Sequence, residues 1–292
     1  MSLDELNAAG LLNSSPEQLR SFGFERCYIS DVPASELALR AAKKLMEQTK
    51  AEPESIDLLL YAGAFAESQG QSFLSHFNYP VAKMQYELGL INASAFGINQ
   101  AGCMGLTQAI TTGLDFLGAN AYAKRVLCVS ADVLPQGESR EILYNVISDG
   151  ACAVLVEREC PRNRMKAHRA ITKGYYWDCI ARKNEIMAAY FPTAKYLIEH
   201  LLFVAQCSID QLQLVVPHNV SLRSWEILLG LTGIKREKLF TQNIAGRGHV
   251  IAGDNWMNLK DSIDLNLLNP GDKLLLFNFG FGANWSATLI EH

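Results

Sequence analysis

The 292-residue sequence lacks several features that would place it in common functional classes. Its seven cysteines include no Cys-x-x-Cys pair, so we expect reduced thiols, with neither a zinc site nor a disulfide framework. It has no long basic run, and its net charge of −4 argues against nucleic acid as a main partner. The longest apolar stretch, residues 58–66, is too short to span a bilayer, and no leader is expected at the start. These absences predict a cytoplasmic protein that uses no metal, nucleic acid or membrane.

The composition and the order of elements are instead typical of a large α/β protein. Hydrophobic residues make up 49% of the chain, which is enough for a sizeable core. Apolar strands alternate with helices, which favours layers built on a mostly parallel sheet. We expect strands at 57–63, 93–100, 125–131, 151–157, 213–217, 273–279 and 286–291, with 166–177 extended. We expect helices at 35–49, with Ser35 as N-cap, and at 81–90, 192–206, 222–231 and 255–265.

Cys103 is the candidate nucleophile. It lies in a small-residue bend, residues 97–105, between an apolar strand and a helix. The first N–H groups of a helix are unpaired and its dipole is positive there, so this position stabilises a thiolate, the form that attacks a carbonyl carbon. A buried cysteine is otherwise an ordinary small hydrophobe. The other six cysteines lack such a bend, and we expect them to be packing residues.

Two histidines far along the chain strengthen this interpretation. His218 follows an apolar strand that ends at Pro217, and His249 lies in a glycine-rich loop before another helix. A cysteine with distant histidines that meet in space is typical of a cysteine acyl-transfer site, although a structural role for each histidine remains an alternative. Asn219 is expected to cap a helix and Asp149 to lie in a turn. Asp254, five residues after His249, could cap the helix that begins near Asn255 or orient a histidine, and capping is the preferred interpretation.

Five motifs then occur in an order that resembles the ketoacyl-ACP synthase III family of the thiolase-like superfamily. They are Ala101-Gly102-Cys103, Ser148 to Val154, Val216-Pro217-His218-Asn219, Asn243 to His249, and Phe279 to Trp285. The resemblance runs from about Glu25 to the C-terminus. It implies a thiolase-like α/β fold of two similar halves in an α-β-α-β-α arrangement, with halves at 1–163 and 164–292.

The resemblance also implies roles for individual residues. Cys103 would carry the acyl group, and the backbone amides of Cys103 and Phe281 would form the oxyanion hole. His218 and His249 would serve the second half-reaction. Phe77 would close the acyl tunnel of a partner subunit, with local aromatic packing of Phe73, Phe77 and Tyr79 as the alternative. The family implies a homodimer of twofold symmetry, no permanently bound cofactor, and substrates carried as coenzyme A or acyl-carrier-protein phosphopantetheine thioesters.

Two departures from the family pattern bear on function. Family members typically have Asn where His249 stands, so the catalytic set here reads Cys-His-His. The family opens with a glycine-containing strand and a Trp-bearing segment that packs on the adenine of coenzyme A, and neither is visible before Arg26. Loss of the strand would change the edge or centre of the first sheet, and loss of the Trp favours a donor carried on protein-bound phosphopantetheine.

Three functions remain open from the sequence. The first is decarboxylative condensation of an acyl group on Cys103 with a malonyl-type thioester, in fatty acid or polyketide biosynthesis. The second is transfer of the acyl group from Cys103 to a hydroxyl, amine or other nucleophile in secondary metabolism, for which His249 would be a general base. The third is a noncatalytic partner subunit that retains the fold.

Overall fold

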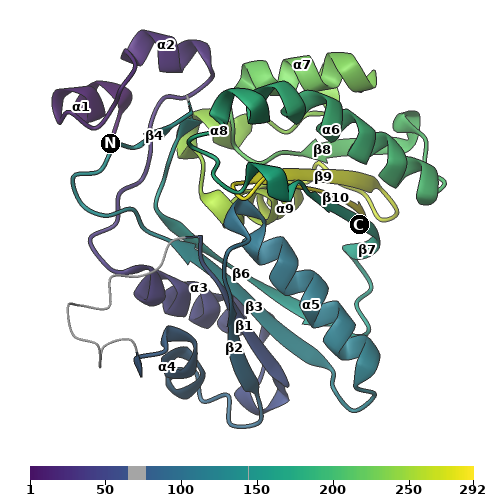
Figure 1. The fold of residues 1–292 in the computed structure, drawn as a ribbon. Helices are drawn as coiled ribbons and strands as arrows, with labels where there is room; N and C mark the ends of the chain where they lie inside the picture. The colour runs from purple at the N-terminus through teal and green to yellow at the C-terminus, as the bar shows by residue number, and fades with distance from the viewer. Residues whose placement is uncertain (65–76, 144) are drawn as a thin grey trace.

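The computed structural model describes residues 1–64, 77–143 and 145–292, which form two main sheets between layers of helices (Figure 1). The strand order is β2-β1-β3-β6 in the first sheet and β7-β10-β9-β8 in the second. The strands of the first sheet are β1 (Leu58–Ala62), β2 (Ser94–Ile98), β3 (Arg125–Asp132) and β6 (Gly150–Glu157). The strands of the second sheet are β7 (Arg164–Thr172), β8 (Leu212–Val216), β9 (Lys273–Gly280) and β10 (Asn284–Glu291). A short hairpin, β4 (Glu141–Ile142) and β5 (Asn145–Val146), lies apart from both.

Helices cover both sheets and fill the space between them (Figure 1). The outer helices are α3 (Ala34–Thr49) and α4 (Pro80–Glu87) on the first sheet, and α6 (Lys183–Val204) and α7 (Leu222–Thr232) on the second. The central helices are α5 (Gly105–Ala119) and α9 (Asp254–Asp264), which share one hydrophobic core with both sheets. Trp256 of α9 donates from Nε1 to Thr107 of α5 over 3.1 Å. This layering confirms the predicted α-β-α-β-α fold.

The two halves repeat the same pairing pattern. β1 runs parallel to β3, which is antiparallel to β6; β8 runs parallel to β9, which is antiparallel to β10. The halves differ at both edges: β10 pairs with a further strand, β7, whereas β6 is the last strand of its sheet, and β1 pairs with a further strand, β2, whereas β8 is the last of its own. Among the described residues, β1 and β3 therefore form the centre of the first sheet, and β6 lies at one of its edges.

The N-terminal residues pack on the second half instead. They form two short helices, α1 (Leu3–Ala8) and α2 (Pro16–Ser21). Leu3, Leu6 and Leu19 are fully buried in the core that contains α6 and α7. The division of the chain near residue 163 stays a proposal.

Several element boundaries differ from the prediction, each for a local reason. Helix α3 begins one residue before Ser35, and Pro33 is its N-cap. Helix α6 begins at Lys183 and continues through Pro192, because buried residues recur at helical spacing on both sides of the proline. Strand β7 ends at Thr172, and a 3-10 turn follows where extended chain was expected. None of the helices in the described ranges is both long enough and apolar enough to cross a membrane.

A buried ion pair joins the hairpin to the start of β6. The guanidinium of Arg140 lies 2.5 Å from Asp149, and the two side chains are 3% and 1% exposed. Asp149 also accepts hydrogen bonds from the backbone amides of Ser30 and Leu134. The predicted structural role of Asp149 is confirmed, and it is larger than that of a turn residue because one carboxylate fixes three segments.

We predict that Arg140→Met lowers the free energy of unfolding by about 3 kcal/mol or more, because it leaves the Asp149 carboxylate buried without its cation. Arg40→Met is the control, since Arg40 forms an exposed pair with Glu36 in α3 and its loss should cost well under about 1 kcal/mol. Urea unfolding of both variants measures the difference. Equal costs would show that Asp149 does not depend on Arg140.

Candidate active site

Cys103 lies on a tight elbow between β2 and α5. The chain turns through Gln100 and Gly102, whose φ angles of 64° and 52° are left-handed, and enters a 3-10 turn at Gly102–Met104 that leads into α5. The close approach of Gly280 explains the small residues here, because a Cβ on Gly280 would lie 2.9 Å from the nitrogen of Cys103. The predicted strand–bend–helix setting of Cys103 is confirmed.

The loop after β9 is locked against this elbow. A Cβ on Gly102 would lie 3.1 Å from the amide nitrogen of Phe281, so that amide is beside the elbow. The Nδ2 group of Asn278 on β9 donates to the carbonyl of Cys103 over 2.6 Å. These contacts hold the amides of Cys103 and Phe281 in one region, although their role as an oxyanion hole stays a prediction.

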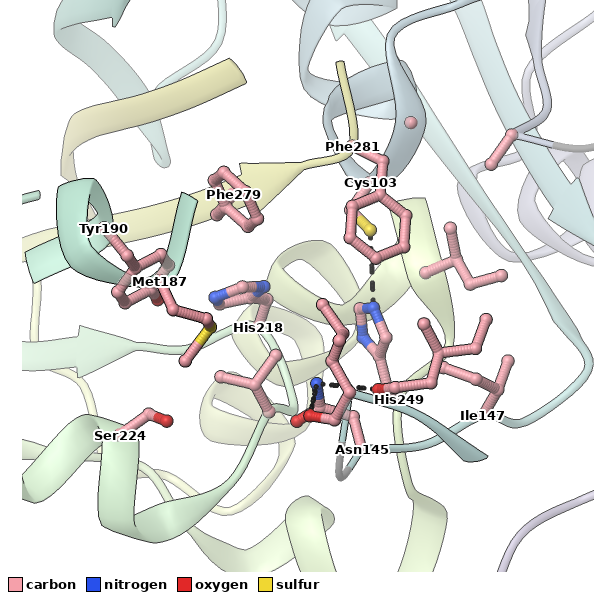
Figure 2. A pocket seen from close by; sticks show the side chains of 16 residues that line it. Cys103, Asn145, Ile147, Met187, Tyr190, His218, Ser224, His249, Phe279 and Phe281 are labelled. Atoms are coloured by element: carbon pink, nitrogen blue, oxygen red, sulfur yellow. Dashed lines mark hydrogen bonds between the residues drawn. The ribbon is translucent and has the colours of Figure 1, made fainter. Parts of the chain in front are cut away.

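His249 touches the candidate nucleophile. Its Nε2 lies 3.3 Å from the sulfur of Cys103, 146 positions away in sequence (Figure 2). The backbone of His249 is held on both sides, because its amide donates to Val146 and its carbonyl accepts from Ser148. These two bonds tie the loop after α8 (Gln242–Arg247) to β5 and the residues before β6.

A carboxylate lies on the other side of the His249 ring. The Nδ1 of His249 is 2.5 Å from Oδ2 of Asp254, which is fully buried. An ionised carboxylate can only accept, so Nδ1 carries a proton. Burial alone would lower the pKa of His249, but Asp254, followed by the sulfur of Cys103, holds this pKa well above its ordinary value of 6.5.

The pKa of His218 is shifted in the opposite direction to that of His249. His218 follows β8, is 1% exposed, and its ring centroid is 5.9 Å from that of His249. Within the described residues, neither ring nitrogen of His218 has a hydrogen-bond partner. Burial first, and the charge of His249 second, place the pKa of His218 well below 6.5. His218 is therefore neutral at physiological pH and offers an unused ring N–H to a ligand.

Neither Asp254 nor Asn219 is a helix cap, so the preferred predictions were wrong, and for Asp254 the alternative, contact with a histidine, is the one observed. The carboxylate of Asp254 accepts from His249 and from the backbone amides of Asn219 and Val250, and none of these donors belongs to α9. The side chain of Asn219 donates to the carbonyl of Gly248 and accepts from Asn258. The five-residue spacing from His249 to Asp254 was the only signal in the sequence for their contact.

Cys103, His218 and His249 all line one cavity of about 210 Å³ (Figure 2). Its wall is mostly apolar, with Tyr190 and Met187 of α6 on the same side as His218 and Ile147 on the other. Its further apolar residues are Ile142, Leu143, Val220, Ile251, Phe279 and Phe281. Sequence reasoning missed Tyr190, Met187 and Ser224, because nothing in a helix pattern shows which of its residues face a cavity. Such a lining suits an acyl chain.

The remaining predicted residues are placed as follows. Phe77 is 58% exposed and is absent from the cavity wall, so its contact with a partner's tunnel stays a prediction. Phe73, its proposed packing neighbour, lies outside the described residues.

Five of the six other cysteines are buried or half-buried as expected, and burial raises the pKa of Cys152 to about 12. Cys160 is exposed, which corrects its assignment as a packing residue. No cluster of three metal-ligand side chains occurs among the described residues.

Comparison with known proteins gives consistent matches. Residues 96–174 match the family 3-oxoacyl-(acyl-carrier-protein) synthase III, and residues 202–292 match the C-terminal part of that family. A beta-ketoacyl-(acyl-carrier-protein) synthase III of Clostridium perfringens strain SM101 is 28% identical, over 96% of this chain and 92% of its own length.

Solved structures match over the whole chain. The 3-oxoacyl-(acyl-carrier-protein) synthase III of Aquifex aeolicus has a TM-score of 0.85 at 23% identity, covering 100% of this chain and 95% of its own. The acyltransferase ChlB3 has a TM-score of 0.87 at 21% identity, covering 100% and 93%.

We predict that His218 makes folding stability fall on acidification. Its pKa is depressed in the folded protein, so below about pH 6.5 the unfolded chain binds a proton that the folded protein does not, at up to about 1.4 kcal/mol per pH unit. His218→Asn should lose less stability than the wild type between about pH 7 and pH 5 in urea unfolding. His200→Asn, which alters a histidine of α6 outside the cavity wall, should keep the wild-type slope. Parallel curves for the wild type and His218→Asn would contradict a neutral His218.

Proposed function

The chain belongs to the 3-oxoacyl-(acyl-carrier-protein) synthase III family, and we propose that it transfers acyl groups through a thioester on Cys103, by decarboxylative condensation with a malonyl-type thioester. One observation carries the proposal: the Cys103 sulfur lies 3.3 Å from Nε2 of His249, at a cavity that His218 also lines. The relatives named above as synthases III support condensation as the reaction class. The enzyme is thus an acyltransferase.

The first half-reaction loads the acyl group. The Cys103 thiolate attacks the thioester carbonyl, an S–C bond forms, and negative charge develops on the carbonyl oxygen. The amides of Cys103 and Phe281 are the donors that we assign to this oxygen. The carrier's thiolate then leaves and takes the proton that Cys103 had given up, which completes the exchange of one thioester for another.

The second half-reaction forms a carbon–carbon bond. The neutral His218 donates a ring N–H to the thioester carbonyl of a malonyl group, which stabilises the enolate as carbon dioxide leaves. The enolate carbon attacks the acyl carbon on Cys103, and the cysteine leaves as thiolate. A buried ring with no other partner among the described residues suits this role, because it need not give up a protein contact to bind substrate.

A specific feature favours a second candidate function. Asp254 keeps a proton on Nδ1 of His249, so once His249 has given its Nε2 proton to the leaving carrier thiolate, Nε2 is an acceptor that faces the acylated sulfur. An acceptor at that place can take the proton of an incoming hydroxyl or amine. The likeness to the acyltransferase ChlB3 is in keeping with such a transfer.

We further propose a carrier-bound substrate and a twofold homodimer in the cytoplasm. Coenzyme A or acyl carrier protein would deliver the thioester, and no permanently bound cofactor takes part. Strand β2 is at the edge of its sheet, and Phe96 on it is 45% exposed, which suits pairing of this strand with a second copy. Phe77, also exposed, would then close the partner's cavity. A cytoplasm would keep the reactive thiol reduced.

We predict that incubation with acyl thioesters adds one acyl mass to the protein, as seen by intact-protein mass spectrometry. Cys103→Ala should acquire none, because the nucleophile is gone. Cys160→Ser, which removes the exposed cysteine, should be acylated like the wild type. A wild type that stays unmodified with every coenzyme A and carrier-protein donor would favour a noncatalytic subunit.

We predict that the acylated enzyme releases carbon dioxide from malonyl thioester, measured with carboxyl-labelled substrate. His218→Asn should slow this release by roughly 100-fold, since the enolate loses its donor. His200→Asn should release carbon dioxide like the wild type. Acyl transfer to an alcohol or amine with no carbon dioxide released would replace condensation by the second candidate function.

A further inference from the structure

Asp254 is a buried carboxylate whose one cationic partner among the described salt bridges is His249. Its Oδ2 accepts from Nδ1 of His249 and from the amide of Asn219, and its Oδ1 accepts from the amide of Val250. The two amides fix where the oxygens lie, and the imidazole supplies charge. A carboxylate satisfied in this way is held in place.

The backbone between the two residues brings the carboxylate back to the ring. After His249 the chain passes Ile251, whose φ of 41° is left-handed, and makes a 3-10 turn at Ile251–Gly253 before α9 begins. A left-handed conformation at a β-branched residue costs energy and persists only where surrounding contacts enforce it. This turn places Asp254 in contact with Nδ1 of His249, on the side of the ring away from Cys103.

The contact determines what the other ring nitrogen can do. Since Nδ1 donates to Asp254, a neutral His249 has its lone pair on Nε2, and that atom is 3.3 Å from the sulfur of Cys103 (Figure 2). The titratable groups next to His249 are Cys103, Asp254 and His218, and His218 is neutral. The imidazole of His249 therefore lies between the sulfur of Cys103 and the carboxylate of Asp254 and contacts both.

We propose that Asp254 is the positioning residue of a Cys103–His249–Asp254 triad, in which His249 is the base that ionises the nucleophile. The proton moves from Sγ of Cys103 to Nε2 of His249, and both proton and charge stay within the pair until the proton passes to the departing carrier thiolate. Asp254 holds the ring and stabilises the imidazolium without taking the proton. The triad rests on the proposed acyl transfer for its purpose, but the thiol chemistry can be measured without any acyl donor.

The test is the pH profile of Cys103 alkylation by iodoacetamide, in a Cys160→Ser background that removes the exposed thiol. Asp254→Asn should shift the alkylation midpoint upward by at least about one pH unit, about a tenfold loss of rate below the midpoint, because an amide favours the wrong tautomer of His249. Acyl loading by a thioester donor should slow by roughly 100-fold. An unchanged midpoint in a folded Asp254→Asn protein would overturn the proposal.

The control is Asp149→Asn. Asp149 is nearly as buried as Asp254 and also accepts from two backbone amides and one cation, but its cation is Arg140 and it is absent from the cavity wall. This variant should lose stability while its alkylation midpoint stays at the wild-type value. A shift of the same size in Asp149→Asn would show that loss of stability moves the midpoint, and would overturn the positioning role.

A measurement on the unsubstituted protein covers the case in which Asp254→Asn does not fold. With nitrogen-15 histidine, the signals lost in His249→Gln identify His249 in the NMR spectrum. They should show a protonated Nδ1 across the whole alkylation range, and an Nε2 that is still protonated at pH values where Cys103 has already ionised. Protonation only at Nε2 would refute the triad. Alkylation that follows the triad, together with no acylation by any donor, would refute the proposed function and leave the triad standing.

Discussion

The site depends on the meeting of two helix N-termini at the centre of the molecule. The turn at Gly102–Met104, which leads into α5, packs against the turn at Ile251–Gly253, which leads into α9, and both helices lie between the sheets. Each N-terminus presents unpaired N–H groups and a partial positive charge, so two such ends at one place favour a thiolate and a developing oxyanion. Each half of the proposed division supplies one of these turns, which is why Cys103 and His249 come from different halves.

Two histidines of the same cavity are held in opposite charge states. His249 has a carboxylate on one side and a thiol on the other, whereas His218 is surrounded by Trp225, Phe277 and the His249 ring. The difference in pKa follows from these neighbours, because both rings are almost fully buried. Environments that push two titratable groups apart give one of them proton transfer and the other hydrogen-bond donation.

Among the described residues, the site also contains unpartnered polar atoms and left-handed backbone conformations, which proteins usually avoid. His218 has two ring nitrogens without partners in the described part of the chain, and Gln100 and Ile251 have left-handed backbones. Each feature costs stability, and each is held by rigid surroundings: the interlocked glycines at the elbow, and the side-chain amides of Asn219 and Asn258 that tie α9 to the end of β8.

The sequence by itself determined the layers and the candidate residues, and the tertiary structure decided their relations. Strand and helix periodicity, with a bend of small residues at Cys103, was sufficient to predict the α/β fold, the elbow and two histidines after β8 and α8, since these signals are local. The sequence could not show that α6 continues through Pro192, because burial on its far side stabilises that helix. Nor could it separate cap from catalytic partner at Asp254: capping is a local choice, whereas the contact with His249 requires a left-handed Ile251 and two amides from distant turns. Distance in space, which no pattern along the chain encodes, placed a carboxylate beside one histidine and left the ring nitrogens of the other without a hydrogen-bond partner among the described residues.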